Sequence, residues 1–197
     1  MSWLEPITLQ GNHCRLVPLN YEHSDELAQC IEEDNLSDYW YTQIPEANKI
    51  REAIEEKLQL QARGLMLPFT VFSNETTKVV GMTTFMNADP EHKRVEIGGT
   101  WYRKNMQRKG LNTECKALML THAFETLHCI AVELRAHFLN RQSRQAIERI
   151  GAKLDGVLRN HMKLPNGTSR DTCVYSIISN EWPAVKAHLD WLMNKAY

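Results

Sequence analysis

The chain has 197 residues, of which 43% are hydrophobic and 24% are charged, and its formal net charge is −1. These values predict one globular domain spanning 1–197, and they do not favour a strongly electrostatic partnership with nucleic acid or a membrane. No apolar run approaches the roughly 18 residues of a membrane-spanning helix, and residues 1–10 lack a secretory-signal pattern. We therefore expect a cytoplasmic protein.

The cysteines and histidines show no spacing that indicates a disulfide framework or a metal site. The five cysteines include no C-x-x-C pair, and the eight histidines include no H-x-x-x-H pair. Disulfide-rich domains and structural zinc sites depend on such patterns. We therefore expect reduced thiols and no bound metal.

The first half of the chain predicts strands that alternate with helices. Arg15–Leu19 is expected as a short strand, and Ser24–Glu33 as a helix with Ser24 or Asp25 as its N-cap. A second helix is expected at Ala47–Ala62. Helices separated by strands in this way are typical of a layered α and β domain.

Three strands are expected next. Phe69–Phe72 and Lys78–Met86 are joined by a polar turn, and Arg94–Ile97 alternates charged with apolar residues, which is the period of a half-buried strand. Gly98–Gly99 lies inside that last strand, where glycine often marks a bulge or a close backbone approach.

The second half of the chain has the clearest strand signal, at Val132–Phe138, where apolar and polar residues alternate. A helix is expected to begin near Leu111 before it, and another at Asn140–Ile150 after it. The remaining expected elements are two strands around a turn and a final helix: Lys153–Met162, Arg170–Ser179 and a helix opening near Asn180. This order predicts a mixed sheet with helices on its faces.

The stretch EIGGTWYRKNMQRKGLNTECK, which begins at Glu96, is the most informative part of the sequence. Gly110 allows a close backbone approach, and the helix near Leu111 directs unpaired N–H groups and the positive end of its dipole at the loop. Arg108 and Lys109 add positive charge, so the pattern predicts a diphosphate site. The alternative is an ordinary strand–turn–helix connection, and neither GxxxxGK(S/T) nor GxGxxG is present.

Gln107-x-x-Gly110-x-Asn112 resembles the Q/R-x-x-G-x-G/A acetyl-CoA loop of the GNAT N-acetyltransferases, in particular of their RimJ/RimL-like branch. Asn112 departs from the small residue that is usual at the last position. Thr100–Trp101 followed by Gly110–Glu114 is similar to one subgroup of that branch, and the resemblance extends over about 8–182.

The resemblance implies an α+β fold, the GNAT acyl-CoA N-acyltransferase fold. Its central sheet is mixed, mostly antiparallel and about seven strands wide, with strands four and five splayed and helices on both faces. The strand that ends at Trp101 would diverge from Ile130–Phe138 and leave a V-shaped slot. A bulge at Gly98–Gly99 would free backbone groups for the pantetheine arm of the cofactor.

The resemblance also implies acetyl-CoA as the co-substrate. Either Thr100 or Trp101 is expected to present a backbone N–H to an oxyanion, and Arg144 is expected near the cofactor unless it lies on a solvated helix face. The residues expected to bind the cofactor are Thr100, Trp101, Gln107, Arg108, Lys109, Gly110, Leu111, Asn112, Thr113, Asn140, Ser143 and Arg144.

Asn140 and Ser143, spaced N-x-x-S, resemble a family motif in which the Asn contacts the pantetheine amide and the Ser protonates the leaving thiolate. The alternative is that Asn140 caps a helix and Ser143 lies in its first turn. Glu96 is the candidate general base, because a partly desolvated carboxylate has a raised pKa. The alternative for Glu96 is an exposed strand position paired with a basic residue.

Tyr39, Trp40 and Tyr41, together with Glu96, are expected to form the acceptor site, since the segment between the first two helices lines the acceptor pocket in the resembling family. Aromatic rings there could stack on a flat substrate or cover an amine. The alternative is a hydrophobic staple between the helices.

The sequence is compatible with three functions. The first is an N-acetyltransferase acting by direct transfer in a ternary complex on a protein N-terminal α-amine. The second is the same reaction on a small amine, such as an amino acid derivative, an aminoacyl nucleotide or an antibiotic. The third is a non-catalytic acyl-CoA-binding module. A homodimer through the C-terminal strands and helix is also possible, with no nucleic-acid or membrane partner.

Overall fold

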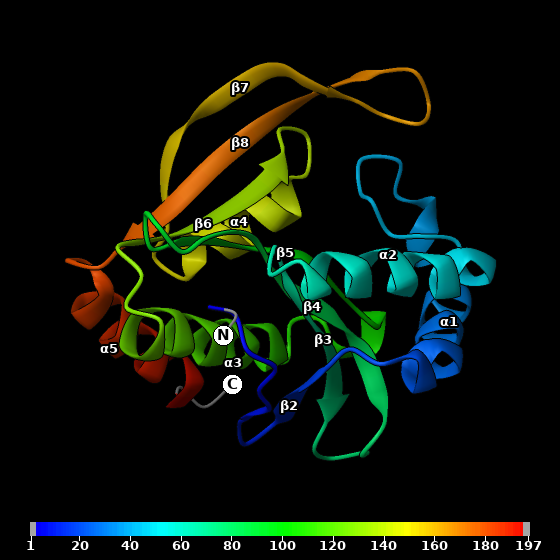
Figure 1. Cartoon of the computed structure of the whole chain (residues 1–197), viewed down its shortest axis with the longest axis horizontal. Coiled ribbons are helices and arrows are strands. Elements are labelled where there is room, and N and C mark those ends of the chain that lie inside the picture. The colour runs from blue at the N-terminus through cyan, green and yellow to red at the C-terminus, as the bar shows by residue number, and fades with distance from the viewer. Residues whose placement is uncertain (1–2, 195–197) are drawn as a thin grey trace.

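A computed structural model describes residues 3–194 and contains one mixed sheet with helices on both faces. The strand order is β1-β2-β3-β4-β5-β6-β8-β7, and every neighbouring pair is antiparallel except β5 and β6, which are parallel (Figure 1). The strands are β1 (Leu9–Gln10), β2 (Cys14–Pro18), β3 (Leu67–Ser73), β4 (Val79–Asp89), β5 (Arg94–Tyr102), β6 (Ala131–His137), β7 (Lys153–Lys163) and β8 (Ser169–Ile178).

Two hydrophobic cores hold the helices against the two faces of the sheet. One core joins α3 and α5 to strand residues such as Phe69 and Val132, and the other joins α1 and α2 to Val79 and Met82. Alternating strand side chains supply both cores, as the two-residue period of a strand requires. The helices are α1 (Ser24–Glu33), α2 (Ile50–Ala62), α3 (Leu111–Thr121), α4 (Arg141–Arg149) and α5 (Trp182–Asn194).

The predicted α+β fold is confirmed, with two differences in detail. The sheet has eight strands rather than about seven, because the two-residue β1 pairs with β2 at the edge. The N-cap prediction at Ser24 or Asp25 is wrong. A 3₁₀ turn, Tyr21–His23, precedes α1, and Asn20 caps that turn in a capping box with His23.

The central strands diverge as expected. β5 and β6 pair only from Arg94 and Ala131 to Glu96 and Glu133, after which both strands continue without pairing to each other. The predicted bulge is also present: the β4–β5 register shifts between Met82 and Thr84, and Gly99 has φ +58°, a conformation that favours glycine. The backbone of β5 beyond Glu96 therefore faces an open slot.

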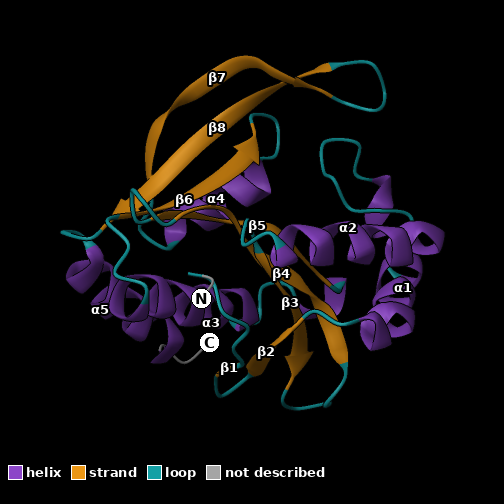
Figure 2. Ribbon diagram, viewed as in Figure 1, coloured by secondary structure: helices purple, strands orange, loops and turns teal. Residues whose placement is uncertain are grey.

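The C-terminal hairpin β7–β8 completes the wall on the far side of that slot. Figure 2 shows the two strands as a long curved ribbon at the top of the molecule, beyond β6. Its turn includes Gly167 at φ +83°, at the predicted hairpin position. None of the helices in residues 3–194 is both long and apolar enough to cross a membrane.

Candidate active site

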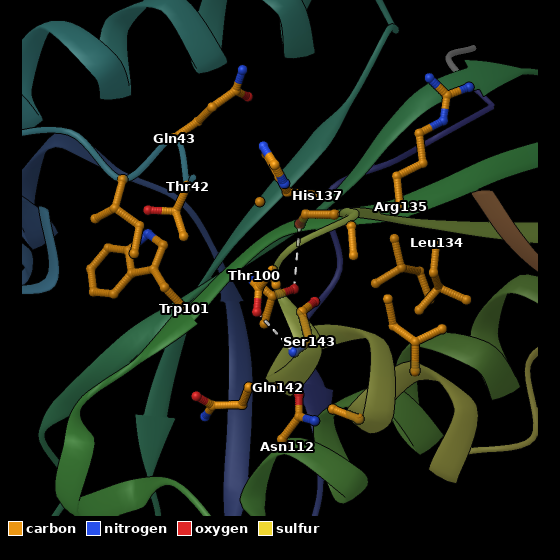
Figure 3. A pocket seen from close by; sticks show the side chains of 18 of the residues that line it. Thr42, Gln43, Thr100, Trp101, Asn112, Leu134, Arg135, His137, Gln142 and Ser143 are labelled. Carbon is orange, nitrogen blue, oxygen red and sulfur yellow. Dashed lines mark hydrogen bonds between the residues drawn. The ribbon is translucent and has the colours of Figure 1, made fainter. Parts of the chain in front are cut away.

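A cavity of about 850 Å³ occupies the slot between the diverging strands. One end is bordered by the beginnings of α3 and α4, and the other by α2, the segment between α1 and α2, and strands β6 to β8. Figure 3 shows Asn112, Gln142 and Ser143 on one side of Thr100, and Thr42 and Gln43 on the other. We call these the loop end and the acceptor end of the cavity.

The loop end has the features of an anion site. Gly110 is the N-cap residue of α3 with φ +82°, no side chain caps the helix, and a Cβ on Gly110 would meet no atom within 4 Å. Arg108 just before it also has a positive φ, of 64°. The first-turn N–H groups of an uncapped helix need acceptors, and a phosphate can supply them.

Most of the predicted cofactor residues come together on this cavity, and three do not. Lys109 lines a separate small hollow beside Asn12 and His13, and Leu111 is buried in the core, so that only its backbone N–H could serve a ligand. Arg144 is the third. Those on the cavity wall are Thr100, Trp101, Gln107, Arg108, Gly110, Asn112, Thr113, Asn140 and Ser143.

Arg144 is half-buried and does not line the cavity. Its Nε donates to the hydroxyl of Tyr175 at 3.0 Å, its Nη1 donates to the Phe138 carbonyl at 3.2 Å, and the guanidinium lies over the Phe138 ring. Tyr175 is fully buried and donates in turn to Glu148. The Tyr175 hydroxyl thus holds the Arg144 side chain away from the cavity wall, and a contact of Arg144 with the cofactor stays a prediction.

Asn140 and Ser143 lie together at the start of α4. The Asn140 side-chain oxygen accepts the backbone N–H of Ser143 at 3.0 Å, so Asn140 is the N-cap of the helix. The cap uses the oxygen only, which leaves the side-chain nitrogen of Asn140 available to a ligand. The capping interpretation and the cofactor interpretation are therefore compatible.

Glu96 is a buried cavity residue with polar partners. It is 6% exposed, and its Oε2 accepts from the Asn87 side chain at 2.7 Å and lies 3.4 Å from Arg135 Nε. Burial raises the pKa of the Glu96 carboxyl, and the positive charge of Arg135 opposes that rise. The alternative of an exposed strand position for Glu96 is therefore wrong, although its basic partner Arg135 on the neighbouring strand is present.

A buried lysine lies beneath the bulge. Lys116 of α3 is 6% exposed, and its Nζ donates to Thr100 Oγ1 at 2.7 Å, which is also 2.8 Å from Thr83 Oγ1. Burial lowers the pKa of Lys116 to about 8. The sequence analysis did not single out this residue. A charged position among the apolar residues of α3 was the available signal, but such a residue is more often solvent-exposed.

His137 is a second residue that the sequence analysis did not assign to the site. Alternation along β6 placed it with the polar residues, yet it is 5% exposed and lines the cavity. Its Nδ1 accepts the Leu139 N–H at 3.0 Å, and its Nε2 is buried with no partner in the described chain. Burial, reinforced by the nearby Arg170, lowers the pKa of His137.

The aromatic segment lies against this histidine. Trp40 packs edge-on to His137 with ring centroids 5.3 Å apart, and Tyr41 is 6.3 Å from the same ring. Tyr39 and Tyr41 line the cavity, whereas Trp40 does not and is 46% exposed. The cluster thus covers the end of β6, and the staple alternative is not what the structure shows.

Glu114, the last residue of the Gly110–Glu114 stretch, has a structural role that the sequence did not reveal. Its carboxylate accepts the backbone N–H groups of Asn12, His13 and Cys14 at 2.7 to 2.9 Å. These bonds fix the turn before β2 to the first turn of α3.

Residues 3–194 contain no cluster of three or more His, Cys, Asp or Glu side chains suited to a metal ion.

Comparison with known proteins agrees with this geometry. Residues 13–153 match the model of the acetyltransferase (GNAT) domain family. A Bacillus subtilis (strain 168) protein named "Putative ribosomal N-acetyltransferase YdaF" is 34% identical over 54% of this chain, and the match spans only 57% of that relative.

Solved structures share the fold over nearly the whole chain. A GCN5-related N-acetyltransferase from Brucella melitensis is 30% identical, covers 96% of this chain and 86% of its own, and has a TM-score of 0.83. Mycobacterium smegmatis RimJ in complex with CoA-disulfide is 18% identical, covers 95% of each chain, and shares the fold with a TM-score of 0.82.

The YdaF match agrees with the predicted RimJ/RimL-like branch. Members of the GNAT family use acetyl-CoA, and the structure provides an uncapped helix start, a splayed sheet and a buried carboxylate on one cavity. The family match covers well over half of the sequence, and the chain therefore belongs to the GNAT family of N-acetyltransferases.

Proposed function

We propose that this protein transfers the acetyl group of acetyl-CoA to a primary amine by direct attack in a ternary complex. The observation that carries the proposal is that one continuous cavity joins the uncapped start of α3 to the buried Glu96, past the bulge at Gly99. An anion site and a candidate base at the two ends of one slot suit a reaction between two bound substrates.

The loop end would hold the cofactor largely through backbone groups. The pyrophosphate would accept the first-turn N–H groups of α3, with Arg108 adding charge. The pantetheine arm would lie along the edge of β5 that no longer pairs with β6, and the Asn140 side-chain nitrogen would donate to it.

Thr100 is the better oxyanion donor of the two that the sequence offered. The N–H of Arg103 donates to the Val80 carbonyl, on the β4 side. Backbone N–H groups alternate sides along a strand, so the N–H of Trp101 also faces β4 and that of Thr100 faces the slot. A donor at this position would stabilise the charge that develops on the thioester oxygen.

Glu96 and Ser143 would carry the two proton transfers. The acceptor ammonium must lose a proton before it can attack, and a carboxylate with a raised pKa is suited to remove it, directly or through water. Ser143, at the loop end, would protonate the departing thiolate of CoA.

The acceptor that we favour first is a protein N-terminal α-amine, in line with the name of the YdaF relative. A small amine is the second candidate, because Tyr39 and Tyr41 line the acceptor end and could enclose a compact substrate. A non-catalytic acyl-CoA-binding module would not need Glu96 in the slot.

Thiol release from acetyl-CoA, measured against a panel of small amines and peptides with free N-termini, tests the proposal. Release that depends on one class of amine establishes the reaction and identifies the acceptor class. CoA binding by calorimetry without release for any amine would contradict the transfer reaction and leave the binding module.

The predicted homodimer and the cytoplasmic location remain predictions. The hairpin carries the exposed apolar side chains Leu154 and Leu158, which could form a subunit contact. Light scattering of the purified protein would give its mass in solution.

A further inference from the structure

The acceptor end of the cavity carries more positive charge than the proposed reaction requires. Among the described residues, Glu96 is the one acidic side chain on the cavity wall, whereas Lys57, Arg135 and Arg170 line the acceptor end. The carboxylate of Glu96 is already matched by Arg135 at 3.4 Å and by Asn87 at 2.7 Å. In the part of the chain that the structure describes, neither Lys57 nor Arg170 forms an ion pair with a carboxylate, although the charge of Glu96 acts on Arg170.

Arg170 presents unused hydrogen-bond donors to the cavity. Its Nε donates to Thr172 Oγ1 at 2.9 Å, and within residues 3–194 no carboxylate forms an ion pair with it. Its two terminal nitrogens are thus free to form the parallel pair of bonds that guanidinium groups make to a carboxylate or a phosphate. Burial lowers the pKa of Arg170, and the negative charge of Glu96 only partly opposes that shift.

His137 offers a second donor at the same place. Because its Nδ1 accepts the Leu139 N–H, the neutral ring carries its proton on Nε2, which is buried and has no acceptor in the described chain. Thr172, which accepts from Arg170, lies opposite His137 in the β6–β8 ladder. A buried donor without an acceptor is costly unless a ligand completes it.

Lys57 of α2 lies on another part of the cavity wall from Arg170 and His137, next to the bulge at Gly99. Its Nζ is 3.9 Å from the position that a Cβ on Gly99 would occupy, and burial lowers the pKa of the Lys57 ammonium. It makes no ion pair with a carboxylate among residues 3–194. An amine substrate without a negative group would bring a further positive charge between Lys57 and Arg170.

We propose that the acceptor carries an anionic group, a carboxylate or a phosphate, which binds between Arg170 and the Nε2–H of His137 while its amine faces Glu96. This inference rests on the proposed transfer reaction and specifies its substrate class. The anion offsets the charge of Arg170 and Lys57, and its pairing with the guanidinium orients the amine toward the base. The anion comes either from a free small molecule or from an acidic side chain near a peptide N-terminus.

Matched pairs of amines separate the charge from every other property of the substrate. We would measure kcat/KM for thiol release with O-phosphoethanolamine against ethanolamine, L-serine against L-serinamide, and Ser-Asp against Ser-Asn peptides with blocked C-termini. We expect the anionic member of at least one pair to be favoured about tenfold or more, the range of a charge-assisted hydrogen bond. The first two pairs test a small-molecule anion, and the third tests an acidic peptide.

The variant Arg170→Met should bring the ratio within the favoured pair close to one. Arg159→Met is the matched control, because Arg159 lies on the same hairpin, pairs with Asp171 and does not line the cavity, so it should keep the full ratio. Calorimetric binding of CoA shows that each variant is folded. If Arg170→Met does not fold, His137→Gln and the amine pairs on the unmodified chain still decide the proposal.

Equal kcat/KM within every pair, or a preference for the neutral members, would overturn the anionic acceptor and leave the transfer reaction standing. A preference that persists in Arg170→Met would overturn the assignment of Arg170. Absence of thiol release with every amine, together with intact CoA binding, would instead contradict the transfer reaction itself, and the inference with it.

Discussion

The two ends of the cavity are built in different ways. The loop end relies mainly on backbone groups of one segment, in which Arg108 and Gly110 have positive φ and the first turn of α3 is uncapped, with the start of α4 beside it. The acceptor end consists of side chains that elements far apart in the sequence bring together, such as Lys57 from α2, Glu96 from β5 and Arg170 from β8. A backbone site tolerates changes of side chain, whereas a side-chain site can change its substrate through single substitutions.

The largest effect is expected at the acceptor end. Glu96→Gln should lower kcat by about 10²–10⁴-fold, the usual contribution of a general base, and leave the Kd for CoA unchanged. Because burial raises the pKa of Glu96, the acid limb of the rate profile should lie above the range of an ordinary glutamate. Thiol release measured against pH, with CoA binding by calorimetry, checks both statements.

Glu133→Gln is the control for that prediction. Glu133 faces Glu96 in the β5–β6 ladder and pairs with Arg135, but it does not line the cavity. Normal turnover in Glu96→Gln, or an equal loss in Glu133→Gln, would remove Glu96 as the base.

The same variant tests the effect of Glu96 on stability. Because the pKa of Glu96 is raised in the folded chain, its ionised form opposes folding as the pH rises through that pKa, so Glu96→Gln should not lower Tm at pH 8.

Gly110→Val should act at the loop end alone. Valine is strained at φ +82°, and its side chain would occupy the space beside the first-turn N–H groups. We expect the Kd for CoA to rise by about 100-fold or more, since several charge-assisted bonds depend on this approach. Calorimetric titration with CoA measures it.

Gly167→Val is a closely matched control for Gly110→Val. Gly167 has φ +83° and, like Gly110, would place a Cβ within 4 Å of no atom, but it lies in the β7–β8 turn. It carries the same conformational strain without a ligand, so its CoA affinity should be normal. Unchanged affinity in Gly110→Val would exclude the loop as the diphosphate site.

Lys116→Met tests the junction between the two ends, beneath Thr100. Burial lowers the pKa of Lys116 to about 8 from 10.5, so between those pH values the unfolded chain binds more protons and stability rises with pH. Relative to Lys116→Met, the wild-type free energy of unfolding should therefore gain on the order of 3 kcal/mol from pH 8 to 10.5.

Denaturant unfolding at several pH values measures this difference. Lys49→Met, at an exposed lysine paired with Glu46, should retain the wild-type slope. If Lys116→Met and the wild type show the same dependence on pH, Lys116 is solvated rather than buried.

The smallest effect is expected at the aromatic cover of the acceptor end. Trp40→Ala removes the edge-on contact with His137, and such aromatic contacts contribute about 0.5–1.5 kcal/mol, or roughly 2- to 10-fold. Because Trp40 does not line the cavity, KM for the amine should rise within that range while kcat and CoA affinity stay constant. A fall in kcat would instead place Trp40 in direct contact with the reacting groups.

The loop end could be predicted from the sequence because its function depends on local backbone conformation. The strand–glycine–helix pattern predicts the turn at Gly110 and the helix that starts after it. The pair Gly98–Gly99 predicts the bulge in the strand. Individual side chains at this end were less predictable. Arg144, for example, is held by a hydrogen bond to Tyr175, 31 residues away, and does not line the cavity.

The sequence by itself determined the order of strands and helices and the strand–glycine–helix pattern at Gly110, because these follow from short-range patterns of polarity and glycine that act over a few residues. The family and the splay of β5 from β6 were expected from the resemblance that the loop residues carry, and not from these patterns. Only the tertiary structure decided that Glu96, His137, Lys57 and Arg170 share one cavity and that the buried Lys116 also contributes to its wall. Burial and charge pairing depend on neighbours far along the chain, so the electrostatics of the acceptor end, and with it the choice of substrate, emerge only when the sheet is assembled.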